Sequence, residues 1–165
     1  MFKHFAEVIA AIEDLKARSL IENYAIFGAV AQAFWDEAIP TFDLDVLVLL
    51  AGPQGLIINL APIYDWAKER GYPEEYEHIV ISGVPVQFVP APPDPLSEEA
   101  VKEAAVRDFH GVPLRVVRPE YLIALWLKPP ANTHARKERA AKLRHAVPID
   151  ETLLADLLRR YNLSW

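Results

Sequence analysis

The alternation of apolar and polar residues along the chain predicts a series of helices and strands. In some segments apolar side chains recur every three or four positions, which places them on one face of an amphipathic helix. Other segments are short apolar or alternating runs bounded by glycine, proline or serine, which is typical of strands. We expect helices over residues 5–17, 29–35, 56–70, 97–107, 120–127, 134–145 and 150–161, and strands over residues 24–27, 43–50, 78–81, 84–89 and 114–117.

The order of these elements indicates the fold class. The segment 43–50 alternates at its start and is wholly apolar afterwards, as a central strand does when it leaves solvent and enters a core covered on both faces. Ser82 and Gly83 separate two strands that form a plausible hairpin. Strands and helices alternate irregularly, so we expect an α/β (α+β) fold: a mixed sheet flanked by helices, with a helical C-terminal part.

Length and composition narrow the class of protein. A chain of 165 residues with 52% hydrophobic content can bury one core, so a single domain over residues 1–165 is expected. The N-terminal region has no sustained apolar run, which predicts no membrane association and a cytoplasmic location. Cysteine is absent, which excludes disulfides, thiolate metal sites and cysteine nucleophiles. The net charge of −6 argues against broad electrostatic attraction to nucleic acid.

Two aspartates at the start of the central strand are the candidate chemistry. Side chains at positions i and i+2 of a strand point to the same face, so Asp43 and Asp45 project together. Their like charges repel unless water or a cation neutralises them, and Mg²⁺ prefers carboxylate oxygens while keeping waters and substrate phosphates as its other ligands. The alternative is a pair of solvated aspartates at a strand end.

A glycine turn precedes this pair by fifteen residues. The apolar run 24–27 ends at Gly28, and Ala29 opens the next predicted helix. Backbone amides at such a junction attract a phosphate, and a glycine lets the ligand approach closely. On its own the glycine indicates only a tight turn; its weight comes from its position before the two aspartates.

These residues resemble a known signature. The segments Phe27-Gly28-Ala29-Val30-Ala31 and Thr41-Phe42-Asp43-Leu44-Asp45-Val46 look like the motif of the polymerase-beta-type nucleotidyltransferase superfamily. Within it, the chain is most similar to small bacterial proteins related to the abortive-infection (AbiEii-like) nucleotidyltransferase toxins. The resemblance touches most of the chain from residue 24 onward, and the stretch from the glycine to the aspartates is its only specific motif.

The resemblance implies a nucleotidyltransferase-like fold and a reaction. A nucleoside monophosphate would pass from a nucleoside triphosphate to an acceptor hydroxyl on RNA such as tRNA, on a protein or on a small molecule. The catalytic and metal-binding residues would be Asp43 and Asp45, with Mg²⁺ or Mn²⁺ as cofactor. The nucleotide would be held by residues Gly28, Ala29, Thr41, Gln87 and Lys137. A role as the toxin of a toxin–antitoxin pair would add an antitoxin protein as partner.

The chain departs from the family pattern at positions that matter for catalysis. The residue after the glycine is often a serine and here is Ala29, which leaves only its backbone to bind phosphate. A third carboxylate is expected on a neighbouring strand, where the chain has Gln87. An amide can ligate Mg²⁺ through its carbonyl oxygen but carries no charge and is no base. Among nearby acids, Glu74, Glu75 and Glu77 precede this strand, and nothing in the sequence places them beside Asp45.

Other candidate residues have ordinary explanations as well. Lys137 belongs to a basic helix, residues 134–145, and a lysine in this region faces the nucleotide in the family; a solvated helix face explains the same charges. No histidines are paired at metal-binding spacing, so a zinc site is not expected.

Three functions therefore remain open from the sequence. The first is a Mg²⁺-dependent nucleotidyltransferase. The second is a catalytically silent member of the fold that binds a nucleotide or a protein, which Ala29 and Gln87 favour. The third is an oligomerising module without a ligand, because a fold alone does not determine a function.

Overall fold

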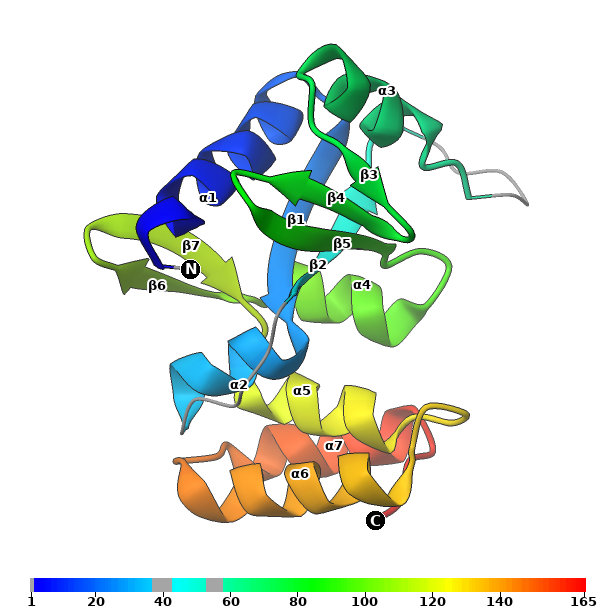
Figure 1. Cartoon of the computed structure of the whole chain (residues 1–165). Helices are drawn as coiled ribbons and strands as arrows, with labels where there is room; N and C mark the ends of the chain where they lie inside the picture. The colour runs from blue at the N-terminus through cyan, green and yellow to red at the C-terminus, as the bar shows by residue number, and fades with distance from the viewer. Residues whose placement is uncertain (1, 37–42, 53–57) are drawn as a thin grey trace.

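The computed structural model describes residues 2–36, 43–52 and 58–165. This part of the chain forms a seven-stranded mixed sheet with the order β3-β4-β5-β2-β1-β7-β6 (Figure 1). The central strand β2 pairs antiparallel with β1 and parallel with β5. The strands are β1 Ile21–Phe27, β2 Leu44–Leu50, β3 Glu74–Glu75, β4 His78–Ile81, β5 Val84–Pro90, β6 Ala105–Phe109 and β7 Val112–Val116. The mixed sheet predicted from the sequence is confirmed.

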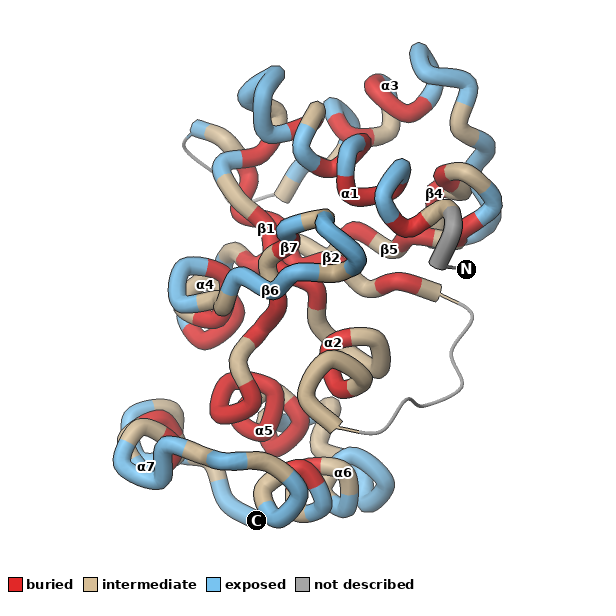
Figure 2. The backbone as a smooth tube through the Cα atoms, turned by 90° about the vertical axis from the view of Figure 1, so that its left-hand side faces the viewer, coloured by how far each residue is buried: buried red, intermediate tan, exposed pale blue. Residues whose placement is uncertain are grey.

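Helices cover both faces of this sheet. Figure 2 shows α1 and α3 on one side of the strands, and α4 and α2 on the other, with α5, α6 and α7 stacked beyond α2. None of the described helices is both long and apolar enough to cross a membrane. The helices are α1 Phe2–Ala17, α2 Gly28–Trp35, α3 Ala61–Glu69, α4 Pro95–Lys102, α5 Pro119–Leu127, α6 His134–Ala146 and α7 Glu151–Arg160.

The apolar patterns that predict the central elements are borne out by burial. Six of the seven residues of β2 are buried, and the one that is only partly buried is Asp45. On α1 the residues at three- and four-residue spacing all face the core: Phe5, Val8, Ile9, Ile12 and Leu15. Burial of each such side chain contributes about 1.5–3 kcal/mol, so the sheet and α1 form a firm base for what lies at the strand ends.

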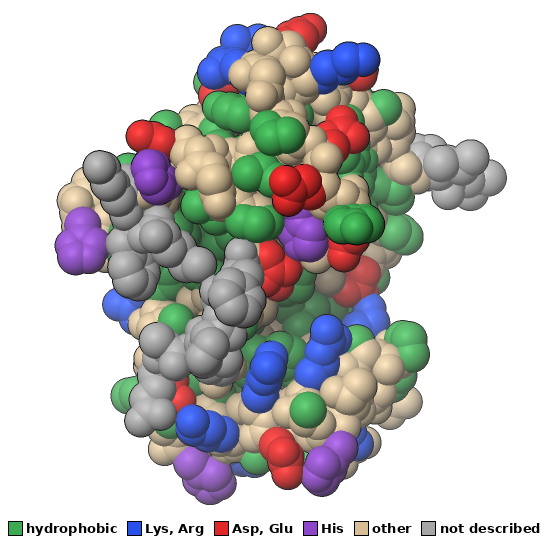
Figure 3. All heavy atoms as spheres, in the orientation of Figure 1, with side chains coloured by type: hydrophobic (Ala, Val, Ile, Leu, Met, Phe, Trp, Pro, Cys, Tyr) green, Lys and Arg blue, Asp and Glu red, His purple; other side chains and the backbone are tan. Residues whose placement is uncertain are grey.

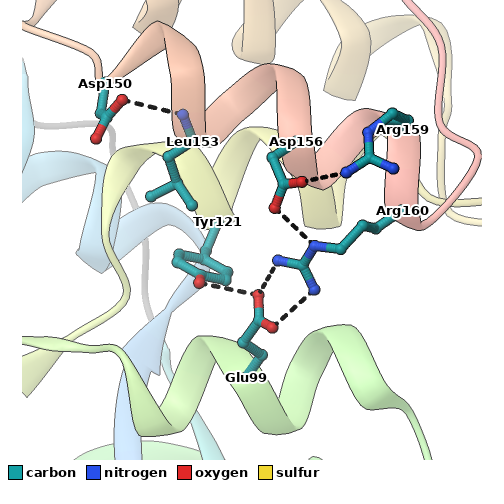
Figure 4. Close-up of polar contacts among 7 residues, drawn as sticks. All are labelled: Glu99, Tyr121, Asp150, Leu153, Asp156, Arg159 and Arg160. Atoms are coloured by element: carbon teal, nitrogen blue, oxygen red, sulfur yellow. Dashed lines mark hydrogen bonds and ion pairs between the residues drawn. The ribbon is translucent and has the colours of Figure 1, made fainter.

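A polar network fastens the C-terminal helices to α4 (Figure 4). The carboxylate of Glu99 on α4 accepts a hydrogen bond of 2.9 Å from the hydroxyl of Tyr121 on α5. It also accepts two bonds of 2.9 Å from the guanidinium of Arg160 on α7. Arg160 in turn donates to Asp156 at 2.7 Å. The planar, two-pronged contact with Arg160 restrains orientation as well as distance, so it holds α7 and α5 at a defined place beside α4.

The helix predicted over residues 97–107 is wrong in its second half. The helix α4 ends at Lys102, and the following residues form the strand β6, which pairs antiparallel with β7. The turn between the two strands is His110-Gly111, and both residues have positive φ angles, 50° and 85°. Such a two-residue turn matches the twist of a hairpin, so strand pairing overrides the helical pattern of the preceding residues.

Two helix starts also differ from the prediction. The helix α4 begins at Pro95, two residues before the predicted start at residue 97, and its cap is Asp94, whose carboxylate accepts the backbone N–H of Ser97 at 3.1 Å. The helix α3 begins at Ala61, whereas a helix from residue 56 was predicted; residues 58–60 are not helical, and residues 56 and 57 lie outside the described part. The proline at position 62 suits the first turn of α3, where its missing N–H is not needed.

Candidate active site

The junction between β1 and α2 brings Gly28 against Asp45. Phe27 pairs with Asp45 across the two strands, so the residue that follows Phe27 lies next to that carboxylate. Gly28 has a φ of 70°, and a Cβ atom added there would lie 2.5 Å from Oδ2 of Asp45. A side chain there would force the carboxylate of Asp45 to move. The glycine is therefore required twice, once by its backbone conformation and once by the close approach of the carboxylate.

Asp43 and Asp45 both line a cavity of about 440 Å³ between the sheet and the C-terminal helices. Gly28 and Ala29 line the same cavity. Burial raises the pKa of Asp45 to about 6, and the charge of Asp43 acts in the same direction. The charges of His78 and Arg136 partly offset this rise. The two aspartates thus lie side by side at the cavity, as the sequence predicts, and the carboxyl group of Asp45 has a raised pKa.

The neighbouring strands extend this row of side chains. Asp45 pairs with Gln87 on the parallel strand β5. The amide of Gln87 thus lies beside Asp45, at the position where the family pattern would have a third carboxylate. On the other side of β5, Ile79 pairs with Val86, and continuing this register by one residue places His78 opposite Gln87. Nε2 of His78 lies 3.2 Å from Oδ2 of Asp43. His78 therefore joins the site although sequence spacing alone did not single it out.

The opposite wall of the cavity is basic. Arg136 and Arg139 lie on α6, one turn apart, and both line the cavity. Figure 3 shows blue basic side chains on the lower wall of a hollow whose upper wall carries acidic side chains and a histidine. Thr133 caps α6 by accepting the backbone N–H of Arg136 at 3.3 Å, which sets the helix start and thus the phase of the two arginines. Within the described residues, Arg139 has no ion-pair partner.

A second polar cluster lies in the same cavity. The carboxylate of Asp94 contacts Nζ of Lys128 and accepts bonds from the backbone N–H and the hydroxyl of Ser97, at 3.1 and 2.6 Å. Burial alone would raise the pKa of Asp94, but the bonds from Lys128 and Ser97 outweigh it and hold the pKa below its usual range. Asp94 is therefore an ionised carboxylate that is already paired with Lys128, so it does not compete with an anionic ligand for the arginines. Apolar side chains line much of the remaining wall: Leu47, Val89, Leu122, Leu125, Trp126 and Pro129.

The structure brings together most of the residues singled out in the sequence. Gly28, Ala29, Asp43 and Asp45 meet at the cavity, with Gln87 beside Asp45 in the sheet. Thr41 lies outside the described residues. Lys137 is on α6 but does not line the cavity; Arg136 and Arg139 on the same helix do. In the described ranges, no three His, Asp or Glu side chains converge closely enough to enclose a metal ion.

Comparison with known proteins relates this arrangement to solved structures. No family model and no curated protein sequence matches the chain. The chain is similar to an antigenic nucleotidyltransferase-like protein from Paracoccidioides brasiliensis, with a TM-score of 0.54 and 14% identity over 98% of this chain and 88% of that one. It is also similar to ANT(2″)-Ia in complex with adenylyl-2″-tobramycin, with a TM-score of 0.50 and 17% identity over 97% and 98% of the two chains. The fold is therefore nucleotidyltransferase-like.

Replacing Gly28 tests the close approach of Asp45. We expect Gly28→Ala to lower the free energy of unfolding by about 1–2 kcal/mol for the left-handed backbone and by roughly 1 kcal/mol or more for the displaced carboxylate. Gly71→Ala is the matched control, because Gly71 has nearly the same φ, 73°, and open space around it. Urea denaturation of both variants measures the difference. Equal losses would show that Asp45 does not restrict position 28.

Replacing Asp45 by asparagine tests the raised pKa of its carboxyl group. The folded-state pKa is about 6, above the ordinary value of 3.8, so the protonated group favours folding below about pH 4 and this contribution is lost as the pH rises through 6. Asp45→Asn is therefore expected to melt a few degrees above the parent at pH 7.5 in metal-free buffer, with the gap closing toward pH 4. Thermal melts across this pH range measure it. A gap that is constant with pH would contradict the assignment.

Proposed function

We propose that this protein is a nucleotidyltransferase that uses a divalent cation to move a nucleoside monophosphate from a nucleoside triphosphate to an acceptor hydroxyl. One observation carries the proposal: Asp43 and Asp45 line a cavity together with the turn at Gly28, and Arg136 and Arg139 face them across it. Carboxylates that hold a metal ion and cationic groups that bind phosphate are two recurring elements of phosphoryl-transfer sites. A nucleotidyltransferase-like fold supports the same reaction class.

The donor groups fit a divalent cation that is only partly enclosed by protein. Asp43 and Asp45 are neighbouring carboxylates, and burial together with the charge of Asp43 makes ionisation of Asp45 costly until a cation is present. Mg²⁺ takes one or two carboxylates and completes its shell with water and substrate phosphates, so two aspartates are a sufficient set. When bound, the ion would neutralise charge on the triphosphate and on the leaving pyrophosphate.

The protein groups around this pair have separate tasks in the proposed reaction. The backbone amides after Gly28 bind phosphate oxygens. Because glycine has no side chain, the phosphate can come close to the backbone at this turn. Arg136 and Arg139 bind the phosphate chain from the opposite wall and restrain its direction. The acceptor oxygen forms its bond to the α-phosphorus while the bond to the bridging oxygen breaks, so pyrophosphate leaves and the hydroxyl proton is released to solvent.

The acceptor is an RNA such as tRNA, a protein or a small hydroxyl compound. ANT(2″)-Ia, a protein of similar fold, is in complex with adenylyl-2″-tobramycin, which makes a small hydroxyl compound the first acceptor class to test. The resemblance to the abortive-infection toxins supports RNA as acceptor and an antitoxin protein as partner.

A specific observation favours a second function, a silent member of the fold that binds a nucleotide without turnover. Gln87 lies beside Asp45 in the strand register, at the place where a carboxylate would complete the triad. Loss of one of three charges weakens the hold on metal and removes a candidate base, while the arginines and the glycine turn that bind phosphate remain.

Calorimetric titration with nucleoside triphosphates, with and without Mg²⁺, tests the metal-dependent site before any acceptor is known. The parent is expected to bind a triphosphate with micromolar affinity only when Mg²⁺ is present. Asp43→Asn/Asp45→Asn is expected to weaken this binding at least about tenfold, because the ion loses both carboxylates while the fold keeps isosteric side chains.

The control for this titration is Asp65→Asn/Glu69→Gln, which removes two negative charges on the exposed side of α3 away from the cavity. It should bind as the parent does. Mg²⁺-dependent binding that survives in the aspartate variant would remove the basis of the proposed metal site, and absence of binding in the parent would remove that of the proposed function.

Gln87→Asp separates the active enzyme from the silent one. If the parent binds nucleotide without turnover, the variant is expected to gain transfer to an offered acceptor, since it restores a third carboxylate beside Asp45. Release of radiolabelled pyrophosphate measures it, with Gln87→Asn as the neutral control. Transfer by the unaltered protein would exclude the silent function.

A further inference from the structure

We propose that Asp43 and His78 form a two-ligand site for a transition-metal dication, and that this site gives the protein a preference for Mn²⁺ over Mg²⁺. The proposal rests on the proposed function only for the role of the ion in transfer; binding of the ion itself is a separate property of these side chains.

The first argument is the separation of the two ligand atoms. Nε2 of His78 lies 3.2 Å from Oδ2 of Asp43. Two ligand atoms that bind one octahedral ion at right angles, each about 2.1 Å away, are themselves about 3 Å apart. The observed separation is therefore already that of two adjacent ligands of one ion, and an ion can enter the pair with little movement of either side chain.

The second argument is access. Asp43 lines the cavity, and its side chain is 39% exposed. His78 does not line the cavity and lies behind this carboxylate, with 20% of its side chain exposed. An ion held by the pair is thus reached from the side of Asp43, where a triphosphate and water can occupy its other positions.

The third argument is the chemistry of the donors at the strand ends. Gln87 leaves the site one negative charge short of three carboxylates, which weakens the binding of any divalent cation. His78, the residue opposite Gln87 in the extended register, offers an imidazole nitrogen in compensation. Mg²⁺ is a poor partner for imidazole, whereas first-row dications accept a nitrogen ligand with an affinity that rises from Mn²⁺ to Cu²⁺. The mixed set of one oxygen and one nitrogen therefore favours Mn²⁺ over Mg²⁺, although Mn²⁺ gains least among the first-row ions.

The same type of contact occurs elsewhere without these features. Nε2 of His134 lies 3.0 Å from a carboxylate oxygen of Glu138, one turn further along α6, with exposed fractions of 88% and 68%. Neither residue lines the cavity. This pair is an ordinary surface contact, and it supplies a control with the same residue types and nearly the same distance.

Metal titration without nucleotide tests the proposal. Free Mn²⁺ is followed by its electron paramagnetic resonance signal at pH 7.5, and Mg²⁺ by its competition with Mn²⁺. The parent is expected to bind Mn²⁺ at least about tenfold more tightly than Mg²⁺. His78→Ala is expected to weaken Mn²⁺ binding about tenfold or more and to leave Mg²⁺ binding within about twofold. His134→Ala should change neither.

A spectroscopic measurement keeps the test decisive if His78→Ala folds poorly. In the parent with isotope-labelled histidine, pulsed electron paramagnetic resonance of bound Mn²⁺ should show the coupling to a directly bound imidazole nitrogen. Absence of that coupling in the parent, or equal affinity for Mn²⁺ in the parent and a folded His78→Ala, would overturn the proposal. Triphosphate binding that persists in His78→Ala with Mg²⁺ leaves the proposed function standing, so the two ideas fail separately.

Discussion

The register between β1 and β2 is the constraint on which the site depends. The pairing of Phe27 with Asp45 puts the turn at Gly28 directly against the carboxylate, which would have to move to admit a side chain at position 28. A slip of one residue would move Asp45 to the opposite face of the sheet, so the apolar residues that bury β2 also determine which way the aspartate points. The register of β2 with β5 then adds Gln87, and that of β5 with β4 adds His78. Backbone pairing thus assembles the acidic wall from four separate segments.

Local charge, and not the net charge of −6, governs what the cavity attracts. The charge of Asp94 is balanced by that of Lys128. Arg136 and Arg139 lie across the cavity from Asp43 and Asp45, so the two walls carry opposite charges. The network that joins α7 and α5 to α4 holds these helices in place, and contacts between α5 and α6 carry that order to the arginines. An acidic protein can in this way offer a cationic wall to an anionic ligand.

The sequence predicts those elements whose pattern and burial agree. Three elements are of this kind: the core face of α1, the strand β2 and the turn at Gly28. The spacing of apolar residues in α1 and β2 matches the residues that are buried, and the glycine at position 28 matches a backbone conformation that other residues rarely adopt. The strand β6 was missed because its residues continue the apolar spacing of α4, and only pairing with β7 across His110-Gly111 decides the matter. Pairing between segments is a long-range property that local spacing does not contain. The pair His110-Gly111 was the local sign of a hairpin turn, because such a turn needs positive φ angles and glycine adopts them readily.

The remaining site residues depend on the same long-range geometry. Arg136 and Arg139 were not distinguished from Lys137 because a charge run does not reveal the phase of its helix; that phase follows from the cap at Thr133. His78 escaped notice because it meets Asp43 across strands and not along the chain. Both findings bear on the missing third carboxylate. In the proposed function, the groups that would bind phosphate lie on α6 and at the glycine turn, apart from position 87. Nucleotide binding would then not require the third charge that turnover would use, so the proposal makes binding and catalysis separable.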